Sequence, residues 1–141
     1  MNPRPTPESL IEANAAFYRA FEALDFAALD ALWEQSDRVF CVHPGWQAIV
    51  GREAVMASWR TILANTGRIA FSLSRVHARV EGRLGVVTLH EVIRAIAGGQ
   101  RHSASAVATN LFAFDEAAGA WKLFHHHASL ASTPEEGAFV N

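Results

Sequence analysis

Cysteine is nearly absent from this sequence: Cys41 is the single one among 141 residues. One cysteine excludes an internal disulfide framework, so we expect a cytoplasmic protein. An excess of charge of one sign is also lacking, because 12 Lys and Arg residues against 14 Asp and Glu residues leave a net charge of −2. This balance offers no basic surface for nucleic acid. No apolar run approaches the ~18 residues of a membrane-spanning helix, and the first residues lack the apolar segment of a secretory signal.

What is present is enough apolar sequence for one folded domain. Half of the residues are hydrophobic, and a chain of this length can bury a core without disulfides or metals. We therefore expect a single domain over residues 1–141, with its core over about residues 8–130. Residues 132–141, which contain Pro134 and Gly137, are expected to form a loose tail.

The first half of the chain predicts helices. Thr6 can cap a first helix, Asp25 can cap a second and shorter one, and a third follows Gly51. A short β-rich run over residues 38–42 lies between the second and third helices. It ends at His43, beside a Pro-Gly turn, so this histidine is expected at the end of a strand.

The second half predicts four antiparallel strands, because short glycine-bearing loops separate long stretches of β-forming residues. The expected strands span residues 68–81, 83–97, 101–115 and 120–131. Helices followed by such a meander predict an α+β fold with the helices on one face of a curved sheet.

The loops between the strands determine which side chains share a face, because side chains alternate along a strand. We take Gly98-Gly99 as a two-residue turn and residues 115–119 as the next loop. One face then carries the cross-strand rows Val87–Asn110–Phe124, Leu89–Ala108–His126 and Glu91–Ala106–Ala128. The opposite face carries Thr88–Thr109–His125 and His90–Val107–His127, flanked by Leu111, Trp121 and Leu123.

Small side chains occupy the middle of the first face, where a solid core would need large apolar residues. Alanines at positions 104, 106, 108 and 128 lie opposite helices rich in aromatic residues, which predicts a ligand cavity. The alternative is that the alanines let the helices pack closer to the sheet. The second face is also partly apolar and the helices can cover one side only. We therefore expect a homodimer that buries this outer face, with Thr88, His90, Thr109, His125 and His127.

Three consecutive histidines invite a metal site, but alternation sends His126 to one face and His125 and His127 to the other. No Asp or Cys completes a ligand set beside them, so we expect no metal. A glycine-rich phosphate loop and a Gly-x-Ser-x-Gly elbow are also lacking, which gives no support to nucleotide-dependent or serine-hydrolase chemistry. We expect no cofactor, and neither a nucleic-acid nor a membrane partner.

The order of elements and several short motifs resemble the SnoaL-like branch of the nuclear transport factor 2-like (NTF2-like) superfamily, over about residues 8–130. The most specific pieces are Leu32-Trp33, the Val50-Gly51 turn into the helix that bears Trp59, Thr109-Asn110-Leu111-Phe112, and Trp121 with His125-His126-His127-Ala128-Ser129. The resemblance implies a cone-shaped fold, commonly dimeric, with three N-terminal helices packed on a curved antiparallel sheet. Ketosteroid isomerases and polyketide cyclases belong to this superfamily. The resemblance implies less about function, because the fold also serves transport factors and binding modules.

Comparison with the isomerase site of that superfamily suggests roles for four positions. His43 lies at about the place of the general base, an aspartate at the end of the first strand. Asn110 takes the place of a protonated aspartate that holds the substrate oxyanion. Phe17 and Trp33 stand where the isomerases have tyrosines. The main hydroxyl donor is therefore expected to be lost, and steroid isomerisation is not expected.

The candidate catalytic residues are His43 as the base, Asn110 as the donor to a carbonyl or enolate oxygen, and His126 with Glu91 as a second acid–base pair. Each has a plain alternative: a turn histidine, a buried amide bonded to the backbone or to water, or polar groups at the cavity mouth. The residues expected to line the cavity are Phe17, Trp33, Trp46, Trp59, Leu89, Ala108, Phe112 and Phe124. We expect a small, largely apolar ligand and cofactor-free isomerase, cyclase or dehydratase chemistry. A non-catalytic binding module and an association domain are the alternatives.

Overall fold

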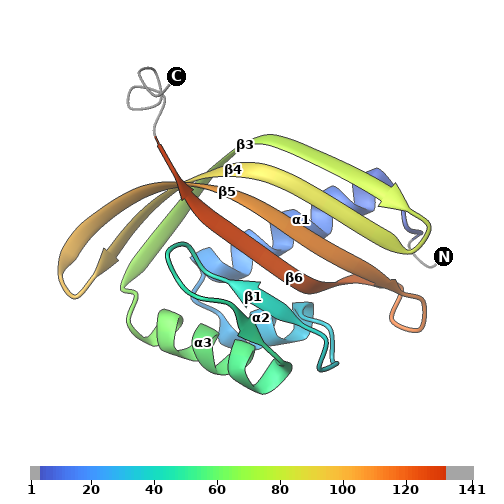
Figure 1. Cartoon of the computed structure of the whole chain (residues 1–141), viewed down its shortest axis with the longest axis horizontal. Coiled ribbons are helices and arrows are strands. Elements are labelled where there is room, and N and C mark those ends of the chain that lie inside the picture. Colours follow the sequence, from blue (N-terminus) through green and yellow to red (C-terminus); the bar gives the residue numbers. More distant parts are fainter. Residues whose placement is uncertain (1–3, 133–141) are drawn as a thin grey trace.

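The computed structural model describes residues 4–132 and shows, within them, three helices against a six-stranded sheet (Figure 1). The helices are α1 (Pro7–Glu22), α2 (Phe26–Leu32) and α3 (Arg52–Ala64). The strands are β1 (Phe40–Val42), β2 (Ile49–Val50), β3 (Arg68–Glu81), β4 (Leu84–Ala97), β5 (Gln100–Asp115) and β6 (Ala120–Ala131). The α+β class is confirmed, and the long strands lie within one residue of their predicted bounds. The expected tail lies outside the described residues apart from Ser132.

Local side-chain contacts start the helices where the sequence predicts. Thr6 accepts a bond from the Ser9 amide, and the Ser9 hydroxyl accepts one from the Thr6 amide, so the two form a capping box before α1. Asp25 accepts a bond from the Ala28 amide at the start of α2. Gly51 precedes α3 with a φ of 94°, a conformation that glycine adopts without strain. No helix within residues 4–132 is long and apolar enough to cross a membrane.

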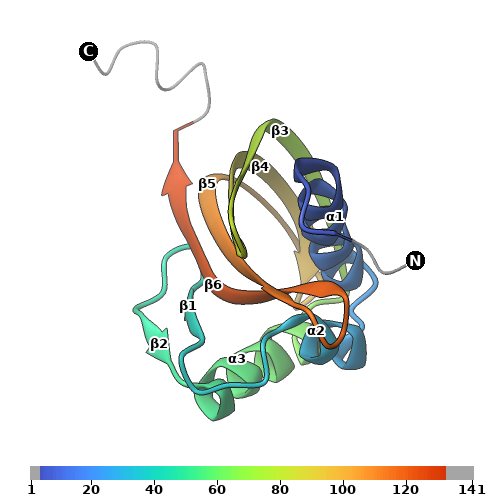
Figure 2. The same cartoon turned by 90° about the vertical axis from the view of Figure 1, so that its right-hand side faces the viewer.

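The sheet is strongly curved, and the helices lie on its inner side (Figure 2). Its strand order is β2-β1-β6-β5-β4-β3, with all neighbours antiparallel except β1 and β6, which run parallel. The short β1 thus makes the predicted antiparallel sheet a mixed one. Cys41 in β1 pairs with His126 in β6. Because side chains alternate, His43 follows Cys41 onto the inner side, close to β6.

The predicted pairing of β4 with β5 is confirmed. The turn at Gly98-Gly99 joins the two strands, and the observed partners are Val87 with Asn110, Leu89 with Ala108, and Glu91 with Ala106. A two-residue turn therefore set this register as expected.

The predicted pairing of β5 with β6 is wrong by two residues. Asn110 lies opposite His126 instead of Phe124. One residue of the shift comes from the loop, because Asp115 pairs with Ala120. The other comes from a β-bulge that leaves Phe124 without a partner. A shift of two keeps His126 on the predicted inner face, whereas a shift of one would have turned it outward.

The bulge also reverses the faces at the start of β6. Trp121 and Leu123, expected on the outer face, are buried against the helices. Trp121 Nε1 donates a hydrogen bond to Ser9 Oγ at 2.9 Å. Phe124, expected at the cavity, lies with its ring 4.1 Å from the Arg38 guanidinium carbon. A bulge sets two residues of one strand against one of the other, so alternation restarts on the opposite face.

The middle of the space between helices and sheet is filled. Ala106, Ala108 and Ala128 are at most 1% exposed and belong to the same core as Phe17 and Trp59. The alanines therefore let large aromatic side chains approach the sheet. This agrees with the closer-packing alternative and not with a hollow at the centre of the sheet.

Candidate functional site

A pocket of about 470 Å³ opens on the inner side of the sheet. Its wall comes from α1, α3, the segment after β1 and the four long strands, and is mostly apolar, with Phe21, Ile62, Ile69, Phe71 and Ile93. Four of the lining side chains are buried and carry polar groups: Tyr18, His43, Glu91 and His126. An apolar pocket with a few convergent polar groups is the usual form of a site for a small molecule.

The predicted site residues divide into three groups. His43, Trp46, Glu91 and His126 line the pocket. Asn110 is fully buried and contacts His126 from behind. The remaining ones, apart from Phe124, are core side chains that do not line this pocket: Phe17, Trp33, Trp59, Leu89, Ala108 and Phe112. The pocket lies toward the β4–β5 hairpin, where Ala95 and Ala97 are its small residues.

A chain of hydrogen bonds links the buried polar groups. His126 Nδ1 donates to Asn110 Oδ1 at 2.5 Å, because an amide oxygen can only accept. Asn110 Nδ2 donates to Asn14 Oδ1 at 2.9 Å and to the Tyr18 hydroxyl at 3.2 Å. The Tyr18 hydroxyl donates to Glu91. Both hydrogens of the Asn110 amide are thus used inside the protein, and neither is left for a ligand.

This chain differs from the contacts expected from the sequence. His126 and Glu91 are joined through Asn110 and Tyr18 rather than to each other. A hydroxyl does lie next to Phe17 in the sequence, that of Tyr18, but it donates to Glu91. Sequence reasoning missed both Tyr18 and Asn14, although they lie four residues apart on the inward face of α1, a spacing that predicts a shared face. Tyr18 is also the single tyrosine of the sequence.

His43 is oriented by α3. Its Nε2 lies 2.9 Å from Ser58 Oγ, which lies 2.7 Å from the Val55 carbonyl oxygen. The carbonyl oxygen can only accept, so the hydroxyl hydrogen points to it and the hydrogen between Ser58 and His43 belongs to His43 Nε2. His43 Nδ1 is then the unprotonated nitrogen of a neutral ring, and Cys41 Sγ lies 3.9 Å from it and 3.6 Å from Nε2.

Aromatic rings hold both histidines in place. His43 packs edge-on against Trp46 and Trp59, with centroids 4.9 and 4.7 Å away. The His126 ring lies 5.1 Å from that of Phe17. The two imidazole centroids are 6.5 Å apart. Both histidines therefore share one wall of the pocket, in surroundings where a charge would be costly.

Burial shifts the pKa of each of the four buried ionisable groups that line the pocket. It lowers the pKa of His43 to about 4 and, together with the neighbouring histidines, lowers the pKa of His126 to about 3. Burial raises the pKa of Glu91, although the bond from Tyr18 opposes this shift. Burial and the charge of Glu91 raise the pKa of Tyr18 well above its ordinary value. At neutral pH both imidazoles are therefore neutral and can accept a hydrogen bond or a proton.

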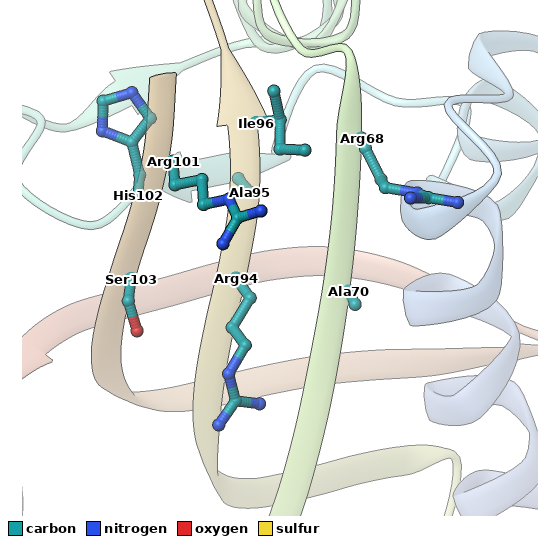
Figure 3. Close-up of a pocket in the computed structure, with 8 residues that line it drawn as sticks. All are labelled: Arg68, Ala70, Arg94, Ala95, Ile96, Arg101, His102 and Ser103. Atoms are coloured by element: carbon teal, nitrogen blue, oxygen red, sulfur yellow. The ribbon is translucent and has the colours of Figure 1, made fainter. Parts of the chain in front are cut away.

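A second pocket, of about 360 Å³, is lined by Arg68, Arg94 and Arg101, which come from three different strands (Figure 3). All three side chains are exposed, so water competes for their hydrogen bonds.

The part of the chain that the structure describes contains no group of three His, Cys, Asp or Glu side chains able to hold a metal ion. The pocket with the buried histidines is therefore the better candidate for a functional site.

Three helices on a curved mixed sheet, with a pocket on its inner side, define an NTF2-like fold. A solved structure from Streptomyces avermitilis, described as a proposed dehydratase of the NTF2-like family, has a TM-score of 0.82 and 38% identity over 90% of this chain and 96% of that one. The profile of the SnoaL-like domain matches residues 10–133. The chain therefore belongs to the SnoaL-like family.

Other relatives have different names. A proposed calcium/calmodulin-dependent protein kinase type II association domain from Thiobacillus denitrificans is 31% identical, with a TM-score of 0.75, over 94% of this chain and all of that one. The F-box protein SKIP8 of Arabidopsis thaliana is 24% identical over 96% of this chain. The chain spans about half (55%) of the length of that curated relative. Names this diverse on one fold do not determine a single function.

Proposed function

We propose that the protein binds a small, largely apolar molecule in the 470 Å³ pocket and moves a proton on it without a cofactor. The observation that carries the proposal is a neutral imidazole, His43, buried at an apolar pocket with its Nδ1 not protonated. A base held in such a wall reaches a bound molecule with little competition from water. Its pKa of about 4 makes His43 a weak base, which restricts it to C–H bonds acidified by a neighbouring group.

The reaction type is an isomerisation, cyclisation or dehydration in which a base removes a proton from carbon. The proton then returns to another carbon in an isomerisation, goes to the attacked carbonyl oxygen in a cyclisation, or leaves with hydroxide as water in a dehydration. The name of the Streptomyces avermitilis relative, a proposed dehydratase, supports this choice. The alternative is a carrier that binds the same molecule without changing it.

Hydrogen–deuterium exchange on a probe molecule separates these two possibilities. 6-Hydroxy-2-tetralone is a suitable probe, because its ketone acidifies the neighbouring C–H bonds and its hydroxyl group can bond to the polar wall. Proton NMR in D₂O follows the loss of its α-hydrogens. We expect the wild-type protein to accelerate this loss and His43→Ala to reduce the acceleration about 100-fold, the lower end of what a positioned base contributes.

His77→Ala is the matched control, because His77 is exposed on β3 and does not line the pocket. Its exchange rate should equal that of the wild type. Probe affinity is measured beside the rate. If His43→Ala binds and exchanges the probe as the wild type does, His43 is not the base. If the wild type binds the probe without accelerating exchange, the protein is a carrier.

A second function, self-association, is supported by the outer face of the sheet. This face carries Val107, which is 38% exposed, and the helices lie on the other side (Figure 2). The residues predicted at a dimer interface all lie on it by alternation: Thr88, His90, Thr109, His125 and His127. Partly apolar sheet faces are commonly covered by another chain. The relative from Thiobacillus denitrificans is itself named as an association domain.

Sedimentation velocity tests whether two copies pair through this outer face. We expect the wild-type chain to sediment as a dimer and Val107→Glu to sediment as a monomer, because a buried unpaired carboxylate is costly. Ala57→Glu, on the exposed side of α3, should remain dimeric. A wild-type protein that stays monomeric at about 100 µM, well above the Kd of a stable dimer, would contradict the proposal.

A further inference from the structure

The hydrogen-bond chain behind the pocket determines what His126 presents to a ligand. Because Nδ1 carries the hydrogen bonded to Asn110, Nε2 of the neutral ring is unprotonated. No donor among residues 4–132 contacts that nitrogen. This nitrogen is not enclosed in the core either. Within the same residues, two fully enclosed polar side-chain atoms lack a hydrogen-bond partner, Trp33 Nε1 and Trp59 Nε1, and His126 Nε2 is not one of them. Since His126 lines the pocket, the lone pair of Nε2 is available to a ligand.

Three other buried groups near the pocket, those of His43, Asn110 and Tyr18, also turn their hydrogens toward the protein. His43 points its hydrogen at Ser58 and keeps Nδ1 as an acceptor. Both amide hydrogens of Asn110 and the hydroxyl hydrogen of Tyr18 are used within the protein. The donors of these three groups are therefore turned toward the protein, and His126 Nε2 offers its lone pair to the pocket.

We infer that the ligand is a neutral molecule with a hydroxyl or N–H group, which donates its hydrogen to His126 Nε2. This inference rests on the proposed binding function and names the chemical class of the ligand. A ligand that brings only acceptor atoms or a negative charge would meet the lone pair of His126 Nε2, lose its hydration and gain no bond from this residue in return. His126 thus selects and orients the ligand, while His43 is the group placed to act on it.

Three naphthalene derivatives of similar shape test this preference by isothermal titration calorimetry at pH 7. They are 2-naphthol, which has a hydroxyl donor, 2-methylnaphthalene, which replaces the hydroxyl by a methyl group of similar size, and 2-naphthalenesulfonate, which is an anion. We expect 2-naphthol to bind about tenfold more tightly than 2-methylnaphthalene, the upper end of the net gain from one neutral hydrogen bond, and the sulfonate to bind most weakly.

The possible outcomes separate this inference from the function on which it rests. Equal affinity for 2-naphthol and 2-methylnaphthalene would overturn the donor preference and leave binding in the pocket intact. Tightest binding of the sulfonate would show that the wall presents donors, which also overturns it. If none of the three binds, the proposed binding function fails, and the inference fails with it.

A variant assigns the preference to His126. His126→Phe keeps an aromatic ring but removes the acceptor, and we expect it to lose the tenfold advantage of 2-naphthol, whereas His77→Phe, outside the pocket, should keep it. Retention of the advantage in His126→Phe would overturn the role of His126. Should that variant not fold, long-range ¹⁵N–¹H spectra of the wild type decide, because they show which imidazole nitrogen carries the hydrogen. A hydrogen on His126 Nε2 at pH 7 would overturn the inference.

Discussion

Asn110→Leu is expected to lower the free energy of unfolding by about 4 kcal/mol. Leucine is close to asparagine in size but cannot form a hydrogen bond. The substitution leaves Asn14, Tyr18 and His126 each without a partner that Asn110 now supplies. The site is 0% exposed, so water does not replace these bonds, and each unpaired buried group costs about 1–3 kcal/mol. Urea unfolding at pH 7, followed by tryptophan fluorescence, measures the loss.

Two further variants calibrate this result. Tyr18→Phe should cost less, because it leaves two buried groups without a partner, Glu91 and one hydrogen of Asn110, while Asn110 keeps its bonds to Asn14 and His126. Gln47→Leu changes an exposed residue and should alter the free energy of unfolding by less than about 0.5 kcal/mol. A loss below about 1 kcal/mol for Asn110→Leu would show that the network is not closed in the folded protein.

The free energy of unfolding is also expected to fall by several kcal/mol between pH 7 and pH 4. In the folded protein the pKa of His43 is about 4 and that of His126 about 3, against an ordinary value of 6.5. Between these pH values the unfolded chain binds more protons than the folded one, so acid favours unfolding. The contribution of His43 is complete above about pH 6.5 and decreases by on the order of 3 kcal/mol as the pH falls to its folded pKa. His126 acts in the same direction.

Glu91 acts in the opposite direction. Burial raises its pKa, so the folded state takes up this proton at a higher pH than the unfolded state does, and acid favours folding at this one group. Acid still lowers the free energy of unfolding overall, because the contributions of His43 and His126 both decrease between pH 7 and pH 4.

Urea unfolding at a series of pH values measures this slope. His126→Gln keeps an N–H donor for Asn110 but does not titrate, so its free energy of unfolding should depend less steeply on pH than that of the wild type. His77→Gln, at an exposed position, should show the wild-type slope. A wild-type profile that is flat from pH 7 to pH 4 would show that the two histidines are not buried in the neutral form.

Much of the fold can be read from short-range patterns. Capping residues such as Thr6 and Asp25 mark where helices begin, and alternation with glycine turns marks the long strands and the pairing of β4 with β5. These features depend on contacts between residues a few positions apart, so they can be predicted directly from the sequence. The family can be recognised for the same reason, because the order of helices and strands along the chain is predicted from local patterns.

The polar wall of the pocket required information that no local pattern contains. The bulge at Phe124 depends on how β6 fits the curved β5, and it decides that Trp121 faces the helices. The bonds of Tyr18 to Glu91 and Asn110 join residues 73 and 92 positions apart. Such contacts exist only once the helix and strands have packed, because burial removes water and leaves each polar group to find a partner in the protein. The amino-acid pattern thus specifies the scaffold and names His43, Glu91 and His126, while packing sets their protonation and the direction of their hydrogen bonds.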